Sequence, residues 1–87
     1  MRNIALSKQA LEDLQFWAFN DIRLLRKVFE LMDSMLRDPF AGIGKPEALK
    51  GDLSGYWSRR INDEHRIVYK VTQELLTIAS CRSHYKI

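Results

Sequence analysis

The hydrophobic pattern of this chain changes its period near the middle, and the change restricts the folds that the chain can adopt. Between residues 10 and 36, apolar side chains recur every three or four positions, which is typical of amphipathic helices. Between residues 55 and 81, apolar residues instead form three short runs separated by polar turns, which is typical of β-strands. The sequence therefore predicts an α+β fold in which two helices precede most of the strands.

The first half of the chain predicts one strand and two helices. Arg2–Leu6 alternates weakly between polar and apolar residues and ends at Ser7, which is suited to capping a helix. The apolar face of the first predicted helix consists of Ala10, Leu11, Leu14, Trp17 and Ala18. The apolar face of the second consists of Leu25, Val28, Phe29, Met32, Met35 and Leu36. Because only Asn20-Asp21 separates the helices and Pro39 ends the second, we expect an antiparallel hairpin packed on one face of a sheet.

The second half predicts a long loop followed by three antiparallel strands. Residues 40–55 contain all four glycines and Pro46 without any clear period, which indicates an ordered loop. The predicted strands are Gly55–Ile61, His65–Val71 and Leu75–Cys81. Short turns join them, as in β-hairpins. The last strand is apolar on both faces, so we expect it to lie inside the sheet rather than at its edge.

Length and composition favour one small domain. The chain has 87 residues and is 46% hydrophobic, which suits a single core for residues 1–87. The only cysteine, Cys81, has no partner for an internal disulfide, and the N-terminus does not resemble a secretion leader, so we expect a reducing, cytoplasmic location. No apolar run is long enough to span a membrane. Two distant histidines and one cysteine form no metal-binding pattern, so we expect no metal and no cofactor. A chain of this size is compatible with a homodimer.

The net positive charge of the chain comes from its second half. Residues 1–40 hold six Lys/Arg and six Asp/Glu, whereas residues 41–87 hold eight and five, which accounts for the net charge of +3. A basic surface suits a polyanion such as RNA, because neutralising phosphates releases counterions and steers the encounter. An ordinary solvated surface explains the same charge equally well, so charge supports RNA binding without deciding it.

Three residues of the second half match the requirements for cutting RNA without a metal. Such a reaction needs a base for the 2′-hydroxyl proton, a cation for the charge around phosphorus, and an acid for the leaving 5′-oxygen. Glu47, Arg66 and His84 are the candidates for these roles, in that order. Histidine suits the last role because its ordinary pKa, about 6.5, lies near neutrality. Each has a simpler interpretation: a loop carboxylate paired with a neighbouring lysine, a surface cation and an exposed tail histidine.

Aromatic and basic side chains near these candidates suit RNA binding. Tyr85 and Trp57 offer faces on which a base can stack, although core packing explains Trp57 better. The basic residues available for phosphates are Lys45, Lys50, Arg59, Arg60 and Arg82. Any one of them is equally compatible with an ordinary surface charge, so they carry information only as a set. His65, beside Glu64 at a turn, is interpreted as structural.

Several motifs of the second half occur together and in a fixed order. They are Gly44-Lys45-Pro46-Glu47, Leu49-Lys50, Leu53-Ser54-Gly55-Tyr56-Trp57-Ser58-Arg59-Arg60-Ile61, Glu64-His65-Arg66-Ile67-Val68-Tyr69 and His84-Tyr85. This combination strongly resembles the YoeB/Txe toxins, which belong to the RelE-like superfamily. The resemblance implies a RelE-like toxin fold, with an N-terminal strand, an antiparallel helical hairpin on one face of the sheet, and three further antiparallel strands.

The resemblance also implies a ribosome-dependent endoribonuclease that cuts messenger RNA in the ribosomal A site and is held inactive by a YefM-like antitoxin. Glu47 then matches the general base, Arg66 the transition-state arginine, His84 the general acid and Tyr85 the terminal aromatic residue. The family's basic residues that could face RNA correspond to Lys45, Lys50, Arg59 and Arg60. The implied products are a 2′,3′-cyclic phosphate and a 5′-hydroxyl. Here Lys86-Ile87 follows the tyrosine with which the family's tail commonly ends.

Two other functions fit parts of the same sequence. A non-catalytic member of the RelE/ParE superfamily would inhibit a protein target, as the gyrase-inhibiting relatives do, although the presence of Glu47 together with His84-Tyr85 argues against it. A plain RNA-binding module would catalyse nothing, and substitutions in it would weaken binding rather than turnover. A short upstream reading frame that encodes a small antitoxin with an acidic or disordered C-terminal segment would favour the toxin.

Overall fold

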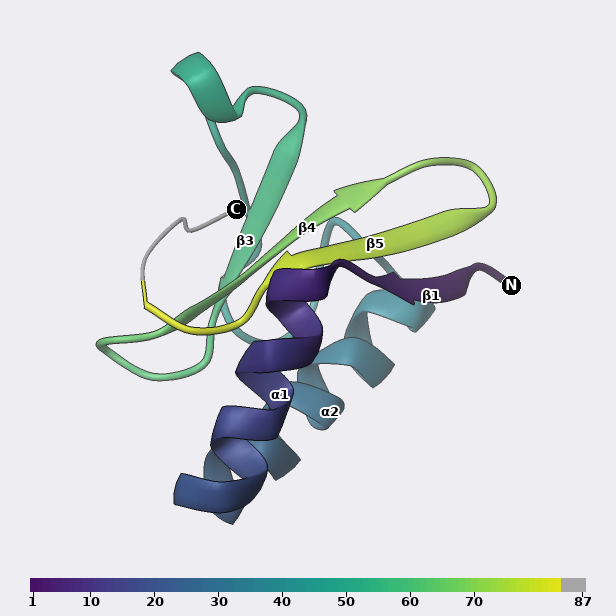
Figure 1. Cartoon of the computed structure of the whole chain (residues 1–87). Helices are drawn as coiled ribbons and strands as arrows, with labels where there is room; N and C mark the ends of the chain where they lie inside the picture. The colour runs from purple at the N-terminus through teal and green to yellow at the C-terminus, as the bar shows by residue number, and fades with distance from the viewer. Residues whose placement is uncertain (84–87) are drawn as a thin grey trace.

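The computed structural model describes residues 1–83, and Figure 1 shows how their helices and strands are arranged. The elements are β1 (Asn3–Leu6), α1 (Lys8–Asn20), α2 (Ile22–Arg37), β2 (Glu47–Ala48), a 3₁₀ turn (Gly51–Leu53), β3 (Tyr56–Arg60), β4 (Arg66–Val71) and β5 (Leu75–Ser80). Neither helix within residues 1–83 has the length and apolar character needed to cross a membrane. Each predicted helix and strand is present, with ends that differ by a few residues at most.

Two short side chains define the ends of the helical hairpin. The Ser7 Oγ accepts a hydrogen bond from the Ala10 N–H at 3.0 Å, which caps α1, and donates one to the Ala79 carbonyl at 2.7 Å, which ties the helix to β5. Asp21 lies between the helices and serves both of them. Its backbone N–H bonds the Trp17 carbonyl at the end of α1, and its carboxylate accepts from the first N–H groups of α2. The two helices therefore form a hairpin whose connection is a single residue.

The sheet has five strands in the order β1-β5-β4-β3-β2. β1 runs parallel to β5, and the remaining neighbours are antiparallel. The α+β class and the interior position of β5 are therefore confirmed. Residues 40–55 are not wholly a loop, however, because β2 pairs with β3 through Glu47 opposite Ser58 and Ala48 opposite Trp57. A strand of two residues is too short to show an alternating pattern in the sequence, so β2 is recognised only by its pairing with β3.

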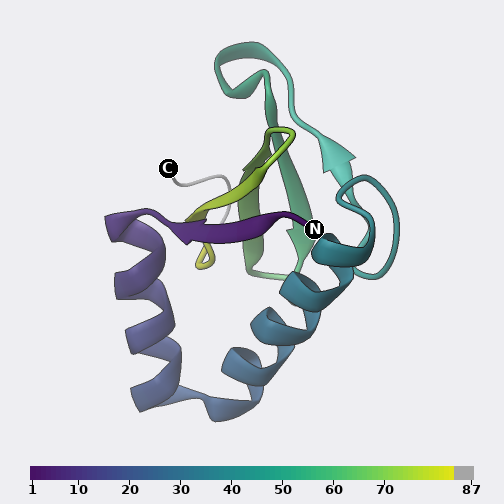
Figure 2. The ribbon, with the colours of Figure 1, turned by 90° about the vertical axis from the view of Figure 1, so that its right-hand side faces the viewer.

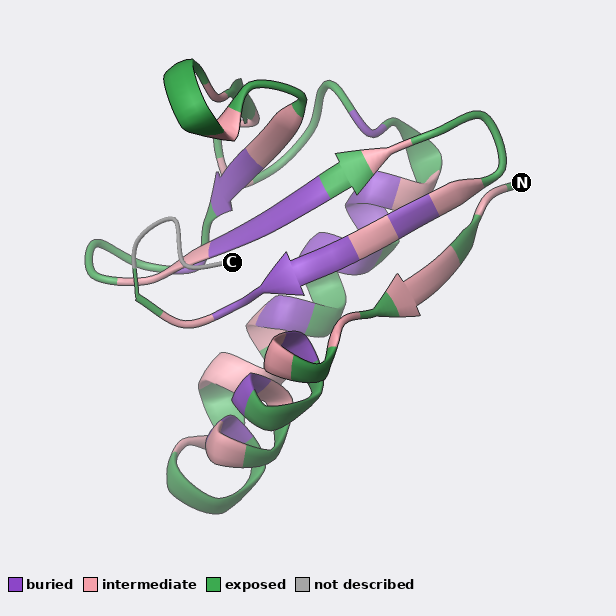
Figure 3. Ribbon diagram, turned by 45° about the horizontal axis from the view of Figure 1, so that its top comes forward, coloured by how far each residue is buried: buried purple, intermediate pink, exposed green. Residues whose placement is uncertain are grey.

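Both helices pack on one face of the sheet (Figure 2), and the core lies between these layers (Figure 3). Its fully buried members include Val28, Leu31, Met35, Ile67, Tyr69, Leu76 and Ile78. The predicted apolar face of α2 was wrong at Phe29, which is 50% exposed, and it omitted Leu31. Val28, Leu31 and Met35 are spaced by three and four residues, so they share one side of the helix. Phe29 is rotated by about 100° from Val28 and therefore faces solvent.

The strand register defines the other face of the sheet. Cross-strand partners share a face, and so do residues two positions apart on one strand. Ser58 and Arg60 of β3 are paired with Glu47 and Arg66 respectively. The intervening residue, Arg59, pairs with the buried Ile67 and points toward the helices. A carboxylate, a hydroxyl and two guanidinium groups consequently lie together on the face that the helices leave uncovered.

Candidate active site on the outer face of the sheet

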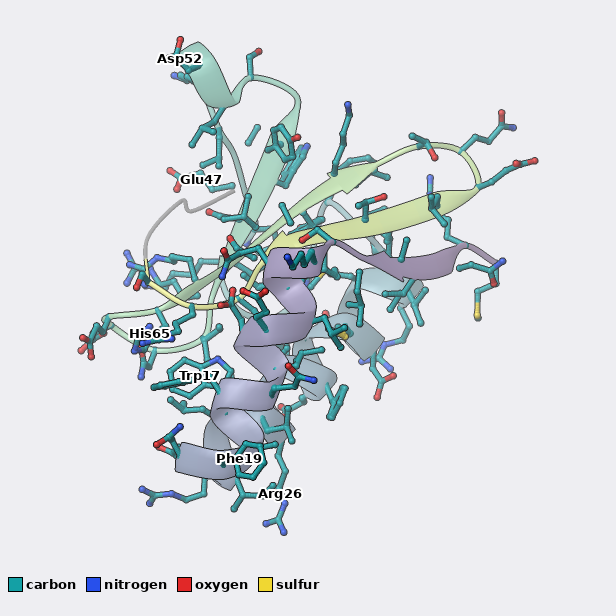
Figure 4. All side chains as sticks on the ribbon, in the orientation of Figure 1. Trp17, Phe19, Arg26, Glu47, Asp52 and His65 are labelled. Atoms are coloured by element: carbon teal, nitrogen blue, oxygen red, sulfur yellow. The ribbon has the colours of Figure 1, made fainter. Side chains whose placement is uncertain are left out.

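A pocket of about 280 Å³ opens on this outer face. Its lining residues are Lys45, Pro46, Glu47, Ser58, Arg60 and Arg66. Glu47 lies well away from the two helices, on the edge strand (Figure 4). A larger hollow of about 600 Å³ lies beside Met1 and the β4–β5 turn, but its lining does not combine a carboxylate with several arginines. The smaller pocket therefore brings together two of the four predicted catalytic residues and two of the predicted RNA-binding residues.

The edge strand β2 presents Glu47 to solvent. Its pairing with Ser58 and a hydrogen bond from the Leu49 N–H to the Tyr56 carbonyl, at 2.9 Å, hold this segment against β3. Just upstream, the Gly44 carbonyl accepts from the Arg60 N–H at 2.6 Å. Glu47 is exposed, and none of the ion pairs formed among residues 1–83 involves it. Its interpretation as a carboxylate neutralised by a neighbouring lysine therefore has no contact to support it.

The turn between β3 and β4 holds the side chain of Arg66. Its Nη1 donates to the carbonyls of Asn62 at 2.7 Å, His65 at 3.1 Å and Asp63 at 3.3 Å. These bonds fix the guanidinium group over the turn without neutralising its charge, because carbonyl oxygens carry only partial charges. The half-buried Arg66 thus brings a full positive charge to the pocket.

Positive charges in the pocket directly oppose each other. Arg60 and Arg66 are cross-strand partners, and like charges in this position repel and reduce stability. A bound phosphate would offset that repulsion through charge-assisted hydrogen bonds. Exposed Lys45 adds a third cation, and Lys50 lines a neighbouring hollow of about 320 Å³ together with Glu47. Ser58, which was not among the predicted site residues, adds a hydroxyl to the lining.

Arg59 corrects the predicted set of RNA-binding residues. Its side chain is completely buried and donates five hydrogen bonds within the protein. The acceptors are the Tyr69 hydroxyl, the Ser34 Oγ and the carbonyls of Asp38, Ala41 and Ile43. A guanidinium group with all five donors engaged inside the fold has none for a phosphate. The alternation of β3 contained this information, because residues 58 and 60 face outward and residue 59 therefore faces the core.

Two further predicted binding residues lie outside the pocket lining. The Arg82 guanidinium is 3.5 Å from the ring centroid of Phe16, on α1, in a cation–π contact. Trp57 pairs with the buried Tyr69, and its ring is 5.0 Å from that of Phe40. These contacts favour the core interpretation of Trp57. The predicted roles of His84 and Tyr85 concern positions outside the described residues.

The buried Cys81 is a poor candidate nucleophile. Burial raises the pKa of its thiol to about 12, and the nearby charge of Asp13 contributes to that rise. The group is therefore a thiol and not a thiolate near neutral pH. Within residues 1–83, no three Cys, His, Asp or Glu side chains gather in a metal-binding arrangement.

Comparison with known proteins identifies the family. The model of the YoeB-like toxins of bacterial type II toxin–antitoxin systems matches residues 6–85. Toxin YoeB of Escherichia coli K12 is 51% identical over 79 residues, which cover 91% of this chain and 94% of that protein. A YoeB dimer from Staphylococcus aureus superimposes with a TM-score of 0.90 at 49% identity, covering 97% and 98% of the two chains. YoeB in a heterotetrameric YoeB–YefM complex from the same organism gives 0.88 at 49% identity, covering 98% and 99%. The chain therefore belongs to the YoeB-like toxins of bacterial type II toxin–antitoxin systems.

Proposed function

We propose that this toxin is an endoribonuclease that cuts messenger RNA in the ribosomal A site without a metal. The observation that carries the proposal is the strand register that places Glu47 beside the Arg60–Arg66 pair around one open pocket. A carboxylate beside two cations suits proton removal next to a phosphate whose charge increases during reaction. The three cations among the pocket residues also suit the phosphate backbone of an RNA strand.

In this mechanism, Glu47 takes the proton of a 2′-hydroxyl, and the oxygen attacks the adjacent phosphorus. Arg66 and Arg60 stabilise the negative charge that accumulates on the phosphate oxygens. The bond from phosphorus to the 5′-oxygen breaks, and His84 supplies the proton that this leaving oxygen needs. The products are a 2′,3′-cyclic phosphate and a 5′-hydroxyl. Lys45 and Lys50 bind neighbouring phosphates, and Tyr85 stacks on a base.

The proposal includes the partners that regulate and direct the toxin. YoeB from Staphylococcus aureus forms a heterotetrameric complex with YefM, which supports a YefM-like antitoxin for this chain. The YoeB dimer from that organism supports a homodimer. The ribosome would supply the messenger RNA in an extended form within the A site. A toxin with these partners would work in the cytoplasm.

The test is primer extension on a defined messenger RNA, with and without programmed ribosomes. The wild type should cut only in the A-site codon of ribosome-bound messenger RNA. Glu47→Gln keeps the shape of the side chain and removes its charge, so the cleavage rate should fall by about 10²–10⁴-fold. Glu74→Gln, at the distant β4–β5 turn, is the matched control and should cut like the wild type.

Each outcome of this experiment separates the candidate functions. Full-rate cleavage by Glu47→Gln would contradict the proposed base. Absence of cleavage by the wild type, in a chain that still arrests growth, would instead favour inhibition of a protein target. Binding of RNA without cleavage would favour a plain binding module.

A further inference from the structure

Ser83 adopts a backbone conformation that is uncommon for residues other than glycine. Its φ is +64°, in the left-handed region, which costs of order 1–3 kcal/mol and persists only where the surroundings enforce it. Two hydrogen bonds supply that enforcement. The Ser83 N–H donates to the Nδ1 of His65 at 2.7 Å, and the Ser83 carbonyl accepts from the Arg66 N–H at 2.9 Å. Both backbone groups of Ser83 are thus hydrogen-bonded to consecutive residues, His65 just before β4 and Arg66 at its start.

The surroundings of His65 fix the orientation of its ring. The ring packs edge-on against Trp17 of α1, with centroids 4.7 Å apart and planes at 77° (Figure 4). Its Nε2 is 3.5 Å from a carboxylate oxygen of Glu64. Because Nδ1 accepts the Ser83 N–H, the proton of a neutral ring resides on Nε2, which faces this carboxylate. The ring is therefore held in one orientation and one tautomer.

Helix α1 holds the segment just before Ser83 in a similar way. The Trp17 indole N–H donates to the Cys81 carbonyl at 2.8 Å, and the Cys81 N–H donates to the buried carboxylate of Asp13 at 2.9 Å. Trp17 consequently contacts both the His65 ring and the end of β5. Two side chains of α1 therefore direct the chain beyond β5 toward His65.

We propose that His65 is a positioning residue for the nuclease reaction. Its Nδ1 accepts the Ser83 N–H while the Ser83 carbonyl is bonded to the backbone of Arg66, the candidate phosphate clamp. Ser83 immediately precedes the candidate acid in the sequence. A histidine that only fills the core would be replaceable by a side chain of similar shape. Here the ring supplies an acceptor to a strained residue next to the predicted acid. The inference rests on the proposed function of Arg66 and His84.

Three substitutions of His65 separate the acceptor from the volume. In His65→Asn, the Oδ1 reproduces the position of Nδ1 as an acceptor. His65→Gln places its amide oxygen near the position of Nε2, and His65→Phe keeps a ring without an acceptor. We expect kcat for ribosome-dependent cleavage to fall about 10- to 100-fold in the Phe and Gln variants with KM within about twofold, because misplacing a reacting group by about 1 Å has effects of this size. The Asn variant should recover most of the loss.

A second measurement reports on the hydrogen bond itself. Amide hydrogen exchange at Ser83 should accelerate in His65→Phe and remain slow in His65→Asn. Ser83→Gly is the matched control, since glycine adopts φ +64° without strain and keeps both backbone bonds. This variant should cut like the wild type.

The combined results distinguish two kinds of failure. If the wild type does not cut RNA while Ser83 exchange depends on His65 as expected, then the proposed function fails and the structural link stands. If Ser83 loses its protection in His65→Phe while kcat is unchanged, the positioning role is overturned. Equal kcat values for the Asn and Gln variants would overturn it as well, even if the Phe variant does not fold.

Discussion

Arg59 and Arg60 are consecutive in the sequence, but their side chains have opposite environments. Arg59 is completely buried with five hydrogen bonds inside the fold, whereas Arg60 is exposed and lines the pocket on the outer face. The side chains of a strand alternate between the two faces of its sheet, so neighbours of identical chemistry have different environments. Arg59 therefore organises the loop before the site, and Arg60 lines the site itself.

The buried Arg59 is held by a hydrogen-bond network of hydroxyl and carbonyl oxygens, without a carboxylate. Around Arg59, the Tyr69 hydroxyl accepts one N–H at 3.1 Å and itself donates to the Pro39 carbonyl at 2.8 Å. Ser34 accepts from Arg59 at 2.7 Å and also from the Ile43 N–H at 3.3 Å. These bonds fold the segment between α2 and β2 around one guanidinium group. Because that segment leads directly to Lys45 and Glu47, the network also sets the entry of the chain into the pocket.

Among residues 1–83, the exposed Arg60 is not surrounded by such a network. The structure pairs Arg60 with another arginine, and the nearby Glu47 forms no ion pair among the described residues. Unbalanced charges of this kind reduce stability and are retained where function requires them. Substitutions on the two faces should therefore separate stability from activity.

The largest effect should come from Arg59→Met. The change leaves the Tyr69 hydroxyl, the Ser34 hydroxyl and three carbonyls without their donor, so we expect a loss of about 3–5 kcal/mol in the free energy of unfolding. Urea unfolding followed by circular dichroism measures it. Arg60→Met is the matched control and should stay within about 0.5 kcal/mol of the wild type. Equal losses would show that the buried and the exposed arginine contribute alike to stability.

Arg60→Met should reduce the cleavage activity strongly, although it has little effect on stability. Removing one preorganised cation from the pocket should lower the cleavage rate by about 10²-fold, while the fold is retained. Lys70→Met is a suitable control, because Lys70 is an exposed cation of β4 that does not line the pocket. Ribosome-dependent primer extension measures both variants. A similar loss in each would show that only overall charge matters.

Two glycines with positive φ sharpen the same distinction on the loop. A Cβ at Gly44 would lie 2.7 Å from Leu31 Cδ2 and 3.1 Å from the Arg60 carbonyl oxygen, whereas a Cβ at Gly51 would meet nothing within 4 Å. Gly51→Ala should therefore cost only the backbone strain, about 1 kcal/mol, and Gly44→Ala about 2–3 kcal/mol. Thermal unfolding of the two variants compares them directly. Equal losses of stability would mean that the segment around Gly44 shifts to accommodate the added Cβ at no measurable cost.

The smallest effect concerns the hydroxyl of Tyr69 and its response to pH. Burial raises the pKa of this hydroxyl, although the hydrogen bond and charge of Arg59 lower it in part. The unfolded chain then releases the proton first, so the wild type loses stability as the pH rises above about 10. Tyr69→Phe should be about 1 kcal/mol less stable at neutral pH and should show a shallower alkaline loss.

Cys81 contributes to the alkaline loss of stability equally in the wild type and in Tyr69→Phe. The pKa of Cys81 is raised to about 12, so its contribution declines over the same alkaline range in the wild type and in the variant. Urea unfolding at several pH values between about 8 and 11 isolates the difference that Tyr69 makes. Parallel curves would assign the alkaline loss to other groups.

Much of the fold was predictable because it depends on local periodicity. The three-and-four spacing of apolar residues predicted the hairpin, and the short apolar runs predicted β3, β4 and β5. Glu47, Arg60 and Arg66 were also predicted as site residues, and the structure brings them to one pocket. The residue types and their order along the chain were sufficient to identify them as candidates.

The remaining features depend on partners that are distant in the sequence. β2 exists because Glu47 pairs with Ser58, and the His65 ring bonds the backbone of Ser83. Three of the five Arg59 hydrogen bonds go to a loop that begins at Asp38. Local patterns report which residue types can form an element and which face they take. They do not report which donor meets which acceptor, because that choice is made only when the helices and strands pack together. Local sequence patterns specify the helices, the strands and the chemistry available, whereas packing selects which charges are buried and which lie on the uncovered face of the sheet.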